Sequence, residues 1–301
     1  MTTASTLGRI VRGTGPGLLL AHGATGSVDG NYGPILEGLA ERHKVVGPDY
    51  PGSGRTPRAE GPLELDRLAD ELVATAVEEG LETFAIAGYS LGGPVALRAA
   101  TRHPERVTAL VLTATFAHPN ARMRLLVEDW LRHLRSDDGE ARARWTLLAG
   151  AGAPYVDRMS PEQLAETVAG GSGSVPPGAI QQVELVGSVD VREDLGRVRV
   201  PTLVISTALD AMVTPYHHRQ VADGIAGAEF AEIPSGHLPF VEAPGEWLGL
   251  IRKFLDAQAA GRPCPSLCGE YGTTTRRRHG VSLSHTHHKL RQGARVRASG
   301  W

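Results

Sequence analysis

The stretch Phe84-Ala85-Ile86-Ala87-Gly88-Tyr89-Ser90-Leu91-Gly92-Gly93 joins a short apolar run to a serine between glycines. The apolar run predicts a buried strand, and the residues that follow, through Thr101, have the spacing of a helix. Ser90 then lies in a sharp strand-to-helix turn, where the neighbouring glycines remove Cβ clashes that would forbid the turn. We interpret Ser90 as a nucleophile at the positive end of the helix dipole. The alternative is a small-residue turn that only lets the strand and the helix pack closely.

On both sides of this turn, short apolar runs alternate with longer helical patterns. This alternation is typical of a mostly parallel, twisted sheet that is flanked by helices on both faces, and it predicts an α/β fold. The expected strands are residues 17–21, 44–47, 84–87, 107–112, 202–206 and 229–233. The other expected helices are residues 34–42, 64–79 and 246–258.

The alternation of strand and helix patterns is interrupted over residues 116–187, where helical patterns dominate and no strand is predicted. We interpret this segment as a helical cap, inserted over the carboxyl edge of the sheet between core segments 1–115 and 188–261. The alternative is a set of ordinary helices covering the sheet. Apolar side chains of a cap are candidates for substrate binding and favour a small to medium uncharged acyl group. They are Phe116, Met123, Trp130, Trp145, Tyr155 and Met159.

A serine hydroxyl needs a neighbouring base, and the base needs an acid to orient it. His237 lies in a loop directly after the last expected strand, so it can reach a serine at the same edge of the sheet. Asp210 follows the strand at 202–206, and its alternative role is that of a helix N-cap. The chain order Ser90, Asp210, His237 is the order of an α/β-hydrolase rather than that of chymotrypsin or subtilisin.

The tetrahedral intermediate of acyl transfer also needs backbone N–H donors for its oxyanion. Leu91, directly after the proposed nucleophile, is the first candidate, and Ala24, in the loop after the strand at 17–21, is the second. We interpret His22 as a residue that braces this loop. The adjacent pair His217 and His218 follows Pro215, and we expect both to lie on the surface at the start of a helix.

Composition narrows the function classes. The chain has 301 residues and a net charge of -2, which is ordinary for a globular protein. No run approaches the ~20 apolar residues that span a bilayer, and the N-terminus lacks the pattern of a signal peptide, so we expect a cytoplasmic protein without a membrane partner. Residues 1–261 contain no cysteine, which excludes a thiol nucleophile there. No G-x-G-x-x-G follows the first strand, and we expect no cofactor.

Residues 262–301 differ in kind, with eight Lys or Arg against one acidic residue and few large aliphatic side chains. Such a composition predicts a disordered basic tail. It lacks the interleaved aromatic residues of a nucleic-acid platform, so no nucleic-acid partner is predicted. The spacing of its possible metal ligands matches no standard zinc site, so no metal is predicted. These ligands are Cys264, Cys268, His285, His287 and His288.

Five segments together resemble the α/β-hydrolase superfamily, over about residues 7–258. They are His22-Gly23 and the ranges 48–54, 88–93, 201–210 and 233–244. The last range is similar to the branch that holds 3-oxoadipate enol-lactonases, small esterases and cofactor-free haloperoxidases. The resemblance implies a helical cap after the sixth strand and a substrate pocket between the sheet and the cap. An abbreviated N-terminal hairpin and the tail depart from the family pattern.

These observations predict a serine hydrolase that cleaves a carboxylic ester, a lactone or a thioester in a small-molecule acyl substrate, by attack of Ser90 on the carbonyl carbon. The same three residues would also suit C–C bond hydrolysis or perhydrolase chemistry of the haloperoxidase kind. A non-catalytic ligand-binding protein of the same fold is a third hypothesis, since a fold alone does not determine a function. Nothing in the sequence pattern indicates an oligomeric state.

Overall fold

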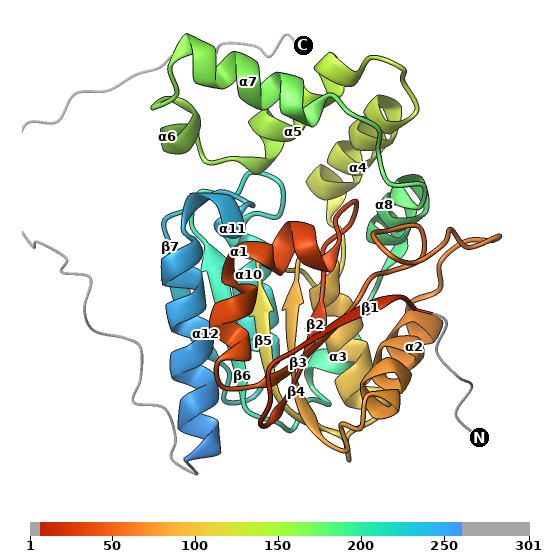
Figure 1. Ribbon diagram of the computed structural model, residues 1–301, viewed down its shortest axis with the longest axis vertical. Helices are drawn as coiled ribbons and strands as arrows, with labels where there is room; N and C mark the ends of the chain where they lie inside the picture. The colour runs from red at the N-terminus through yellow and green to blue at the C-terminus, as the bar shows by residue number, and fades with distance from the viewer. Residues whose placement is uncertain (1–6, 261–301) are drawn as a thin grey trace, which may run out of the picture. The chain divides into compact units, whose positions relative to one another are not determined.

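Seven strands form one sheet in the computed structural model, which describes residues 7–260 (Figure 1). In chain order the strands are β1 (Arg9–Arg12), β2 (Gly17–Ala21), β3 (Lys44–Pro48), β4 (Phe84–Tyr89), β5 (Val107–Thr113), β6 (Thr202–Thr207) and β7 (Glu229–Ile233). Their order across the sheet is β1-β3-β2-β4-β5-β6-β7. Only β1 is antiparallel to its neighbour, so the predicted mostly parallel sheet is confirmed.

Helices connect the strands and extend the chain beyond the sheet. Among the described residues they are α1 (Val28–Ala40), α2 (Leu65–Glu78), α3 (Gly92–Arg102), α4 (Ala121–Leu134), α5 (Gly139–Gly150), α6 (Ala153–Val156), α7 (Pro161–Gly171), α8 (Ala179–Ser188), α9 (Arg192–Leu195), α10 (Pro215–Gly224), α11 (Pro239–Glu242) and α12 (Pro244–Ala259).

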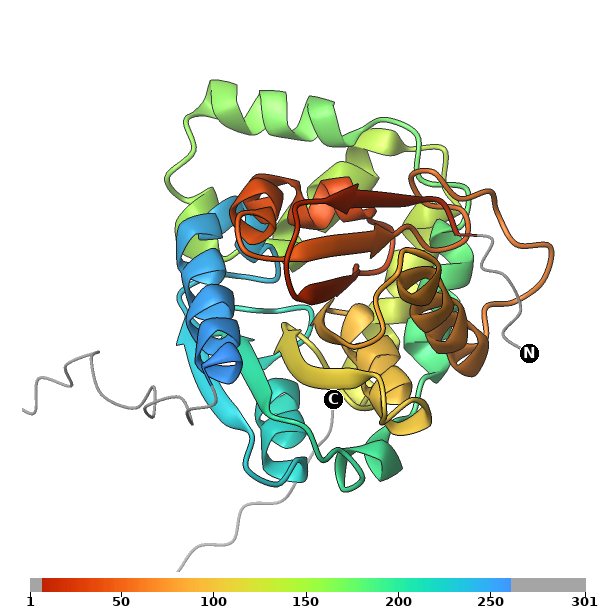
Figure 2. The same cartoon turned by 60° about the horizontal axis from the view of Figure 1, so that its bottom comes forward.

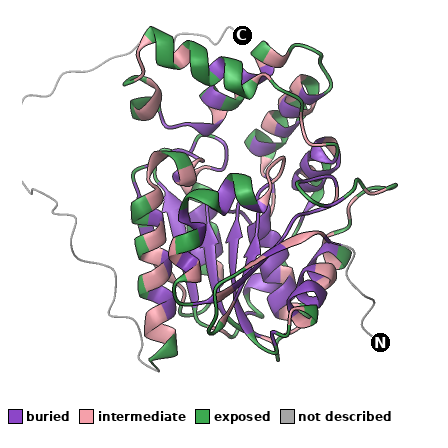
Figure 3. Ribbon diagram, in the orientation of Figure 1, coloured by how far each residue is buried: buried purple, intermediate pink, exposed green. Residues whose placement is uncertain are grey.

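The sheet divides the core into two layers, because successive side chains of a strand point to opposite faces. Leu18 and Leu20 face the layer that is closed by α1 and α12. Leu19 faces the opposite layer, which is closed by α2 and α3. The view in Figure 2 looks at the sheet between these helices, and Figure 3 shows that its strands are buried while the outer faces of the helices are exposed. Both faces of the sheet are therefore covered, as the apolar runs predict.

Two elements differ from the sequence expectation. The strand β1 was not predicted; it lies at the sheet edge and pairs with β3 from Arg9 opposite Pro48 to Arg12 opposite Val45. The helix α1 begins six residues earlier than predicted, because the side chain of Ser27 accepts a hydrogen bond from the Gly30 N–H and caps it at Val28. Pro34, which was expected to start the helix, lies inside it.

The chain between β5 and β6 is helical, and no strand is assigned to residues 116–187. Figure 1 shows α5, α6 and α7 beyond the carboxyl ends of the parallel strands, while α4 and α8 lie lower and beside each other. Buried residues of α4 and α8, among them Met123 and Val183, belong to the same apolar layer as α2 and α3. The helices α5, α6 and α7 thus lie beyond the edge of the sheet where Ser90 follows β4.

In residues 7–260 no helix combines the length and the apolar character that crossing a bilayer requires. The basic tail that was predicted over residues 262–301 lies outside the described part of the chain.

Candidate active site

Ser90 lies in the turn between β4 and α3, with a backbone φ of 52°. Positive φ is strained for a residue with a side chain, and the neighbouring glycines make the turn possible. A Cβ on Gly92 would lie 2.0 Å from the Ala21 carbonyl oxygen, and a Cβ on Gly88 would lie 2.5 Å from the Gly92 oxygen. The turn is also held by a hydrogen bond from the Thr115 hydroxyl to the Ser90 carbonyl, at 2.8 Å. The strained conformation is thus built into the packing around Ser90.

The structure brings Ser90, Asp210 and His237 together, although 147 positions separate Ser90 from His237. The Ser90 Oγ lies 3.0 Å from His237 Nε2, and His237 Nδ1 lies 2.7 Å from Asp210 Oδ2. A carboxylate only accepts hydrogen bonds, so Nδ1 donates to it and Nε2 presents a lone pair to the serine hydroxyl. All three side chains are buried, and the hydroxyl is poised to give its proton to the imidazole.

The carboxylate of Asp210 has further donors that hold its orientation. Its Oδ1 accepts from the backbone N–H groups of Met212 and Val213, at 2.9 and 2.8 Å. Its Oδ2 accepts from the Thr207 hydroxyl at 2.9 Å, beside the bond from His237. Two groups on each oxygen therefore aim the carboxylate at the imidazole.

His217 and His218 are buried, so the expectation that they lie on the surface is wrong. The first turn of α10 packs against β6, and His218 Nδ1 lies 3.1 Å from the Ser206 hydroxyl of that strand. His218 Nε2 lies 3.9 Å from Asp210 Oδ2, the oxygen that also faces His237. Burial lowers the pKa of His218 to about 4, so this imidazole is neutral at physiological pH.

The loop that bears His237 is tied to the C-terminal end of α5. The His237 N–H donates to the Gly150 carbonyl at 2.6 Å. Glu242 Oε2 accepts from the backbone N–H groups of Gly236, at 2.8 Å, and of Gly152, at 3.1 Å. From the sheet side, the Tyr89 hydroxyl donates to the His237 carbonyl at 2.6 Å. The position of the imidazole thus depends on both the sheet and the segment between β5 and β6.

The loop after β2 passes directly beside Ser90. A Cβ on Gly23 would lie 3.2 Å from the Ser90 Cβ. His22 braces the start of this loop, since its Nε2 accepts from the Tyr50 N–H at 2.8 Å, and burial lowers its pKa to about 4. The Gly23 N–H donates to Asn31 Oδ1 at 3.0 Å. Ala24 follows in the same loop, and Leu91 directly follows Ser90, so both predicted oxyanion donors belong to segments next to the hydroxyl.

The six apolar residues predicted to bind substrate are distributed over several places. Phe116 and Met123 are buried in the core layer with α2 and α3. Trp130 stacks on Trp145, with ring centroids 5.6 Å apart, and lines a cavity of about 190 Å³ that also includes Thr25. Tyr155 and Met159 line a separate hollow of about 340 Å³. Trp130 thus lines a cavity together with Thr25 of the loop beside Ser90.

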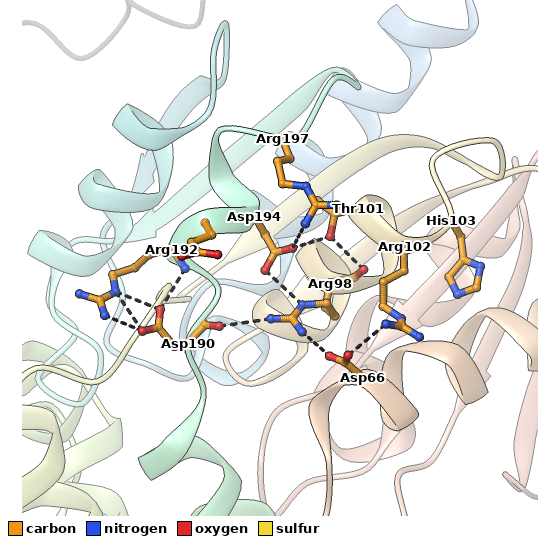
Figure 4. A pocket seen from close by; sticks show the side chains of 10 residues that line it. Asp66, Arg98, Thr101, Arg102, His103, Asp190, Arg192, Asp194 and Arg197 are labelled. Atoms are coloured by element: carbon orange, nitrogen blue, oxygen red, sulfur yellow. Dashed lines mark hydrogen bonds and ion pairs between the residues drawn. The ribbon is translucent and has the colours of Figure 1, made fainter.

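A cavity of about 990 Å³ lies away from these residues, between α2, α3 and α9 (Figure 4). Arg98 stands at its centre between Asp66 and Asp194, and Arg102 also pairs with Asp66. The guanidinium groups of Arg98 and Arg102 are therefore paired with carboxylates of the protein in an ion-pair network. Within residues 7–260, no group of three or more His, Cys, Asp or Glu side chains could hold a metal ion.

Sequence reasoning missed three residues that hold the site: Asn31, Gln182 and Glu242. Asn31 and Gln182 contact the loop after β2, and Glu242 contacts the His237 loop. Glu242 lies within a segment that carries the family resemblance, which was a usable signal. Gln182 is 157 positions away from its partner Thr25, and no local pattern connects the two.

Comparison with known proteins adds a second line of observation. Residues 16–244 match a protein family described as alpha/beta hydrolase fold. The chain is 33% identical over 247 residues to pyrrolizixenacetamide deacetylase of Xenorhabdus hominickii, which covers 81% of this chain and 92% of that protein. It is 28% identical to a pimeloyl-(acyl-carrier protein) methyl ester esterase of Chromobacterium violaceum, over 82% of this chain and 97% of the esterase.

Among solved structures, an enol-lactonase from Burkholderia xenovorans LB400 is similar with a TM-score of 0.74. That similarity covers 83% of this chain and 96% of the lactonase, at 23% sequence identity. At this identity the likeness concerns the fold.

Proposed function

The chain belongs to the alpha/beta hydrolase fold family, and from that membership we propose that it is a serine hydrolase of carboxylic esters, lactones or thioesters. One observation above all supports the proposal. The serine hydroxyl, the imidazole and the carboxylate form a continuous chain of hydrogen bonds, at 3.0 and 2.7 Å. This arrangement converts a weak nucleophile into a strong one, because the base accepts the proton as the oxygen attacks.

The reaction has two steps. In the first, His237 Nε2 takes the proton of Ser90 while Oγ attacks the carbonyl carbon, and the tetrahedral intermediate expels an alcohol or a thiol that receives this proton. In the second, His237 takes a proton from water, the hydroxide attacks the acyl-serine ester, and Ser90 leaves with the proton from the imidazolium. Asp210 stabilises the imidazolium in both steps without taking its proton.

The backbone N–H groups of Leu91 and Ala24 are the proposed donors to the oxyanion. The first is at the start of α3, where the helix dipole favours negative charge. The second is in the loop whose Gly23 approaches Ser90 closely. Because donors of this kind act on charge that develops in the transition state, they raise kcat more than they lower KM.

For the substrate, we propose a small to medium acyl group held between the core segments 1–115 and 188–261 and a cap formed by residues 116–187. Trp130, with its cavity next to Thr25, is the best supported of the predicted binding residues. The deacetylase and the esterase among the relatives both cleave a carbonyl–heteroatom bond by name. Amides should therefore be tested beside esters, since both pass through the same kind of tetrahedral intermediate.

A fluorophosphonate probe tests the proposal directly, because it forms a covalent bond with an activated serine. We expect wild-type protein to be labelled at Ser90 and to hydrolyse p-nitrophenyl butyrate. The variant Ser90→Ala should lose both reactions and keep its stability within ~1 kcal/mol. Wild-type turnover by Ser90→Ala would overturn the proposed function.

C–C hydrolase or perhydrolase activity would appear in a substrate profile as Ser90-dependent turnover of a β-diketone or of peroxide with a carboxylic acid, with little ester hydrolysis.

A further inference from the structure

Gln182 is a fully buried residue of α8 whose carboxamide bonds to two loops of the core. Its Oε1 accepts from the Thr25 N–H at 2.8 Å. Its Nε2 donates to the Pro51 carbonyl at 3.2 Å and to the Ser53 hydroxyl at 2.8 Å. The partners determine the orientation of the amide, because a backbone N–H requires the oxygen and a backbone carbonyl requires the nitrogen.

Thr25 has an unusual backbone. Residues 23–26 form a turn closed by a bond from the Gly26 N–H to the Gly23 carbonyl, at 3.3 Å. Thr25 is the third residue of this turn and has a φ of 61°. Glycine or asparagine is preferred at such a position, and a β-branched residue is strained there. A strained conformation persists only where the surroundings hold it, and the Thr25 N–H is held by Gln182.

The turn also contains the proposed oxyanion donor, Ala24. Gly23 lies against Ser90, since a Cβ on Gly23 would lie 3.2 Å from the Ser90 Cβ, and Ala24 is the next residue. If Thr25 relaxed to negative φ, the peptide between Ala24 and Thr25 would rotate and the turn would change its type. The Ala24 N–H would then move relative to Ser90. His22 and Asn31 form hydrogen bonds with Gly23 at the start of the turn, and the Asn31 carboxamide also lies against Gly26, whereas the Thr25 N–H bonds to Gln182.

We propose that Gln182 is a positioning residue: through the Thr25 N–H it holds the turn 23–26 in the form in which the Ala24 amide faces the oxyanion. This role rests on the proposed hydrolase function. It couples α8, which follows the helices above the sheet, to the rate of the chemical step. Gln182 touches no reacting atom and acts only through the turn.

A purely structural role is the competing explanation. The bonds to Pro51 and Ser53 attach α8 to the loop after β3, and the Gly178 N–H also bonds to the Gly52 carbonyl there, at 3.0 Å. If this attachment were the whole function, loss of Gln182 would reduce stability and leave kcat of the folded enzyme unchanged. Replacing Thr25 with glycine, which relieves its strain, would then leave kcat of the Gln182 variant unchanged.

The test compares four variants by kcat and KM for p-nitrophenyl butyrate, with active sites counted by fluorophosphonate labelling. Gln182→Met keeps the length of the side chain and removes its acceptor, and we expect kcat to fall about tenfold to 10²-fold with KM nearly unchanged. The matched control is Gln181→Met. Gln181 is the buried neighbour on α8, but it bonds to the carbonyls of Ala59 and Gly61, away from the turn, so kcat should stay within about twofold.

The other two variants are Thr25→Gly and Thr25→Gly/Gln182→Met. Glycine adopts positive φ without strain. The double variant should therefore regain most of the kcat that Gln182→Met loses, whereas the structural explanation predicts no rescue. In a crystal structure of Gln182→Met, we expect Thr25 at negative φ.

Three results would overturn the role of Gln182. They are a wild-type kcat in Gln182→Met, an equal loss of kcat in Gln181→Met, and a kcat of the double variant as low as that of Gln182→Met. If Gln182→Met does not fold, Gln182→Leu replaces it; that variant also lacks an acceptor for the Thr25 N–H, so a tenfold or larger loss of kcat supports the proposal and a kcat within about twofold of wild type overturns it. Failure of the proposed function is distinguished by Ser90→Ala, which would then retain activity, and the φ of Thr25 tests the turn without reference to catalysis.

Discussion

At the scale of single residues, the site is determined by how each polar atom is used. Asp210 illustrates this, because its two oxygens have different partners. Oδ1 accepts from two backbone N–H groups, and Oδ2 faces the imidazole and the Thr207 hydroxyl. The Asp210 carboxylate is therefore oriented by the backbone of its own loop, and His237 Nδ1 has one well-defined acceptor.

The substitution Asp210→Asn should reduce kcat by about 10⁴-fold, the size of effect expected when the imidazole takes the wrong tautomer. The two backbone N–H groups that now donate to Oδ1 would donate to the amide oxygen, so the NH2 group would face His237 Nδ1. The imidazole would then keep its proton on Nε2, where it cannot accept one from Ser90. The measurement is kcat for p-nitrophenyl butyrate. The melting temperature should stay close to that of wild type, which shows that the variant is folded. A loss smaller than tenfold would contradict the assignment of Asp210.

At the scale of elements, α5 and the loop after β7 behave as one unit. The end of α5 accepts the His237 N–H through the Gly150 carbonyl, and Glu242 joins the two segments through Gly152 and Gly236. Gly236 has no space for a side chain, because a Cβ there would lie 2.2 Å from the Gly152 nitrogen. The His237 imidazole is therefore positioned in part by a helix that lies beyond the sheet.

Glu242→Ala should destabilise the fold by about 1–3 kcal/mol, because two backbone N–H groups would lose their acceptor. It should also lower kcat by up to about 10²-fold, because the imidazole would be less well placed. Glu242→Gln, which keeps an acceptor oxygen, is the matched control and should retain most of the activity. Chemical unfolding and steady-state kinetics measure the two effects. Equal kcat in Glu242→Ala and wild type would show that the loop is held by its other contacts.

At the scale of the whole molecule, burial lowers the pKa of several histidines. The pKa is lowered, with burial as the largest cause, for His22, His43, His118, His217 and His218. In the unfolded chain each returns to its ordinary pKa of 6.5. Between pH 6.5 and about 4 the unfolded state therefore binds more protons than the folded state does.

The free energy of unfolding should thus decrease as the pH falls through this window and be highest above pH 6.5. Each fully depressed histidine contributes a slope of up to about 1.4 kcal/mol per pH unit. Urea unfolding, followed by tryptophan fluorescence at several pH values, measures the slope. The variant His218→Gln should reduce it, and an unchanged slope in that variant would mean that His218 is not kept neutral by the fold.

The sequence by itself determined the class of fold and the segments that approach the site. Apolar runs predicted six strands whose positions agree with the structure, because burial on both faces leaves a continuous apolar signal. The turn around Ser90 was readable because its glycines and its flanking elements are all local. The chain order of Ser90, Asp210 and His237, at the carboxyl ends of parallel strands, pointed to the edge where the structure brings them together.

The tertiary structure alone decided what surrounds these residues. β1 became a strand only by pairing with β3, and His217 and His218 became buried only because α10 packs on β6. Gln182 meets Thr25 across 157 positions of the chain. The periodicity of apolar residues indicates which face of an element is buried, but it does not indicate which distant element covers that face. The contacts that aim the site are of this second kind, and so they follow from packing in three dimensions.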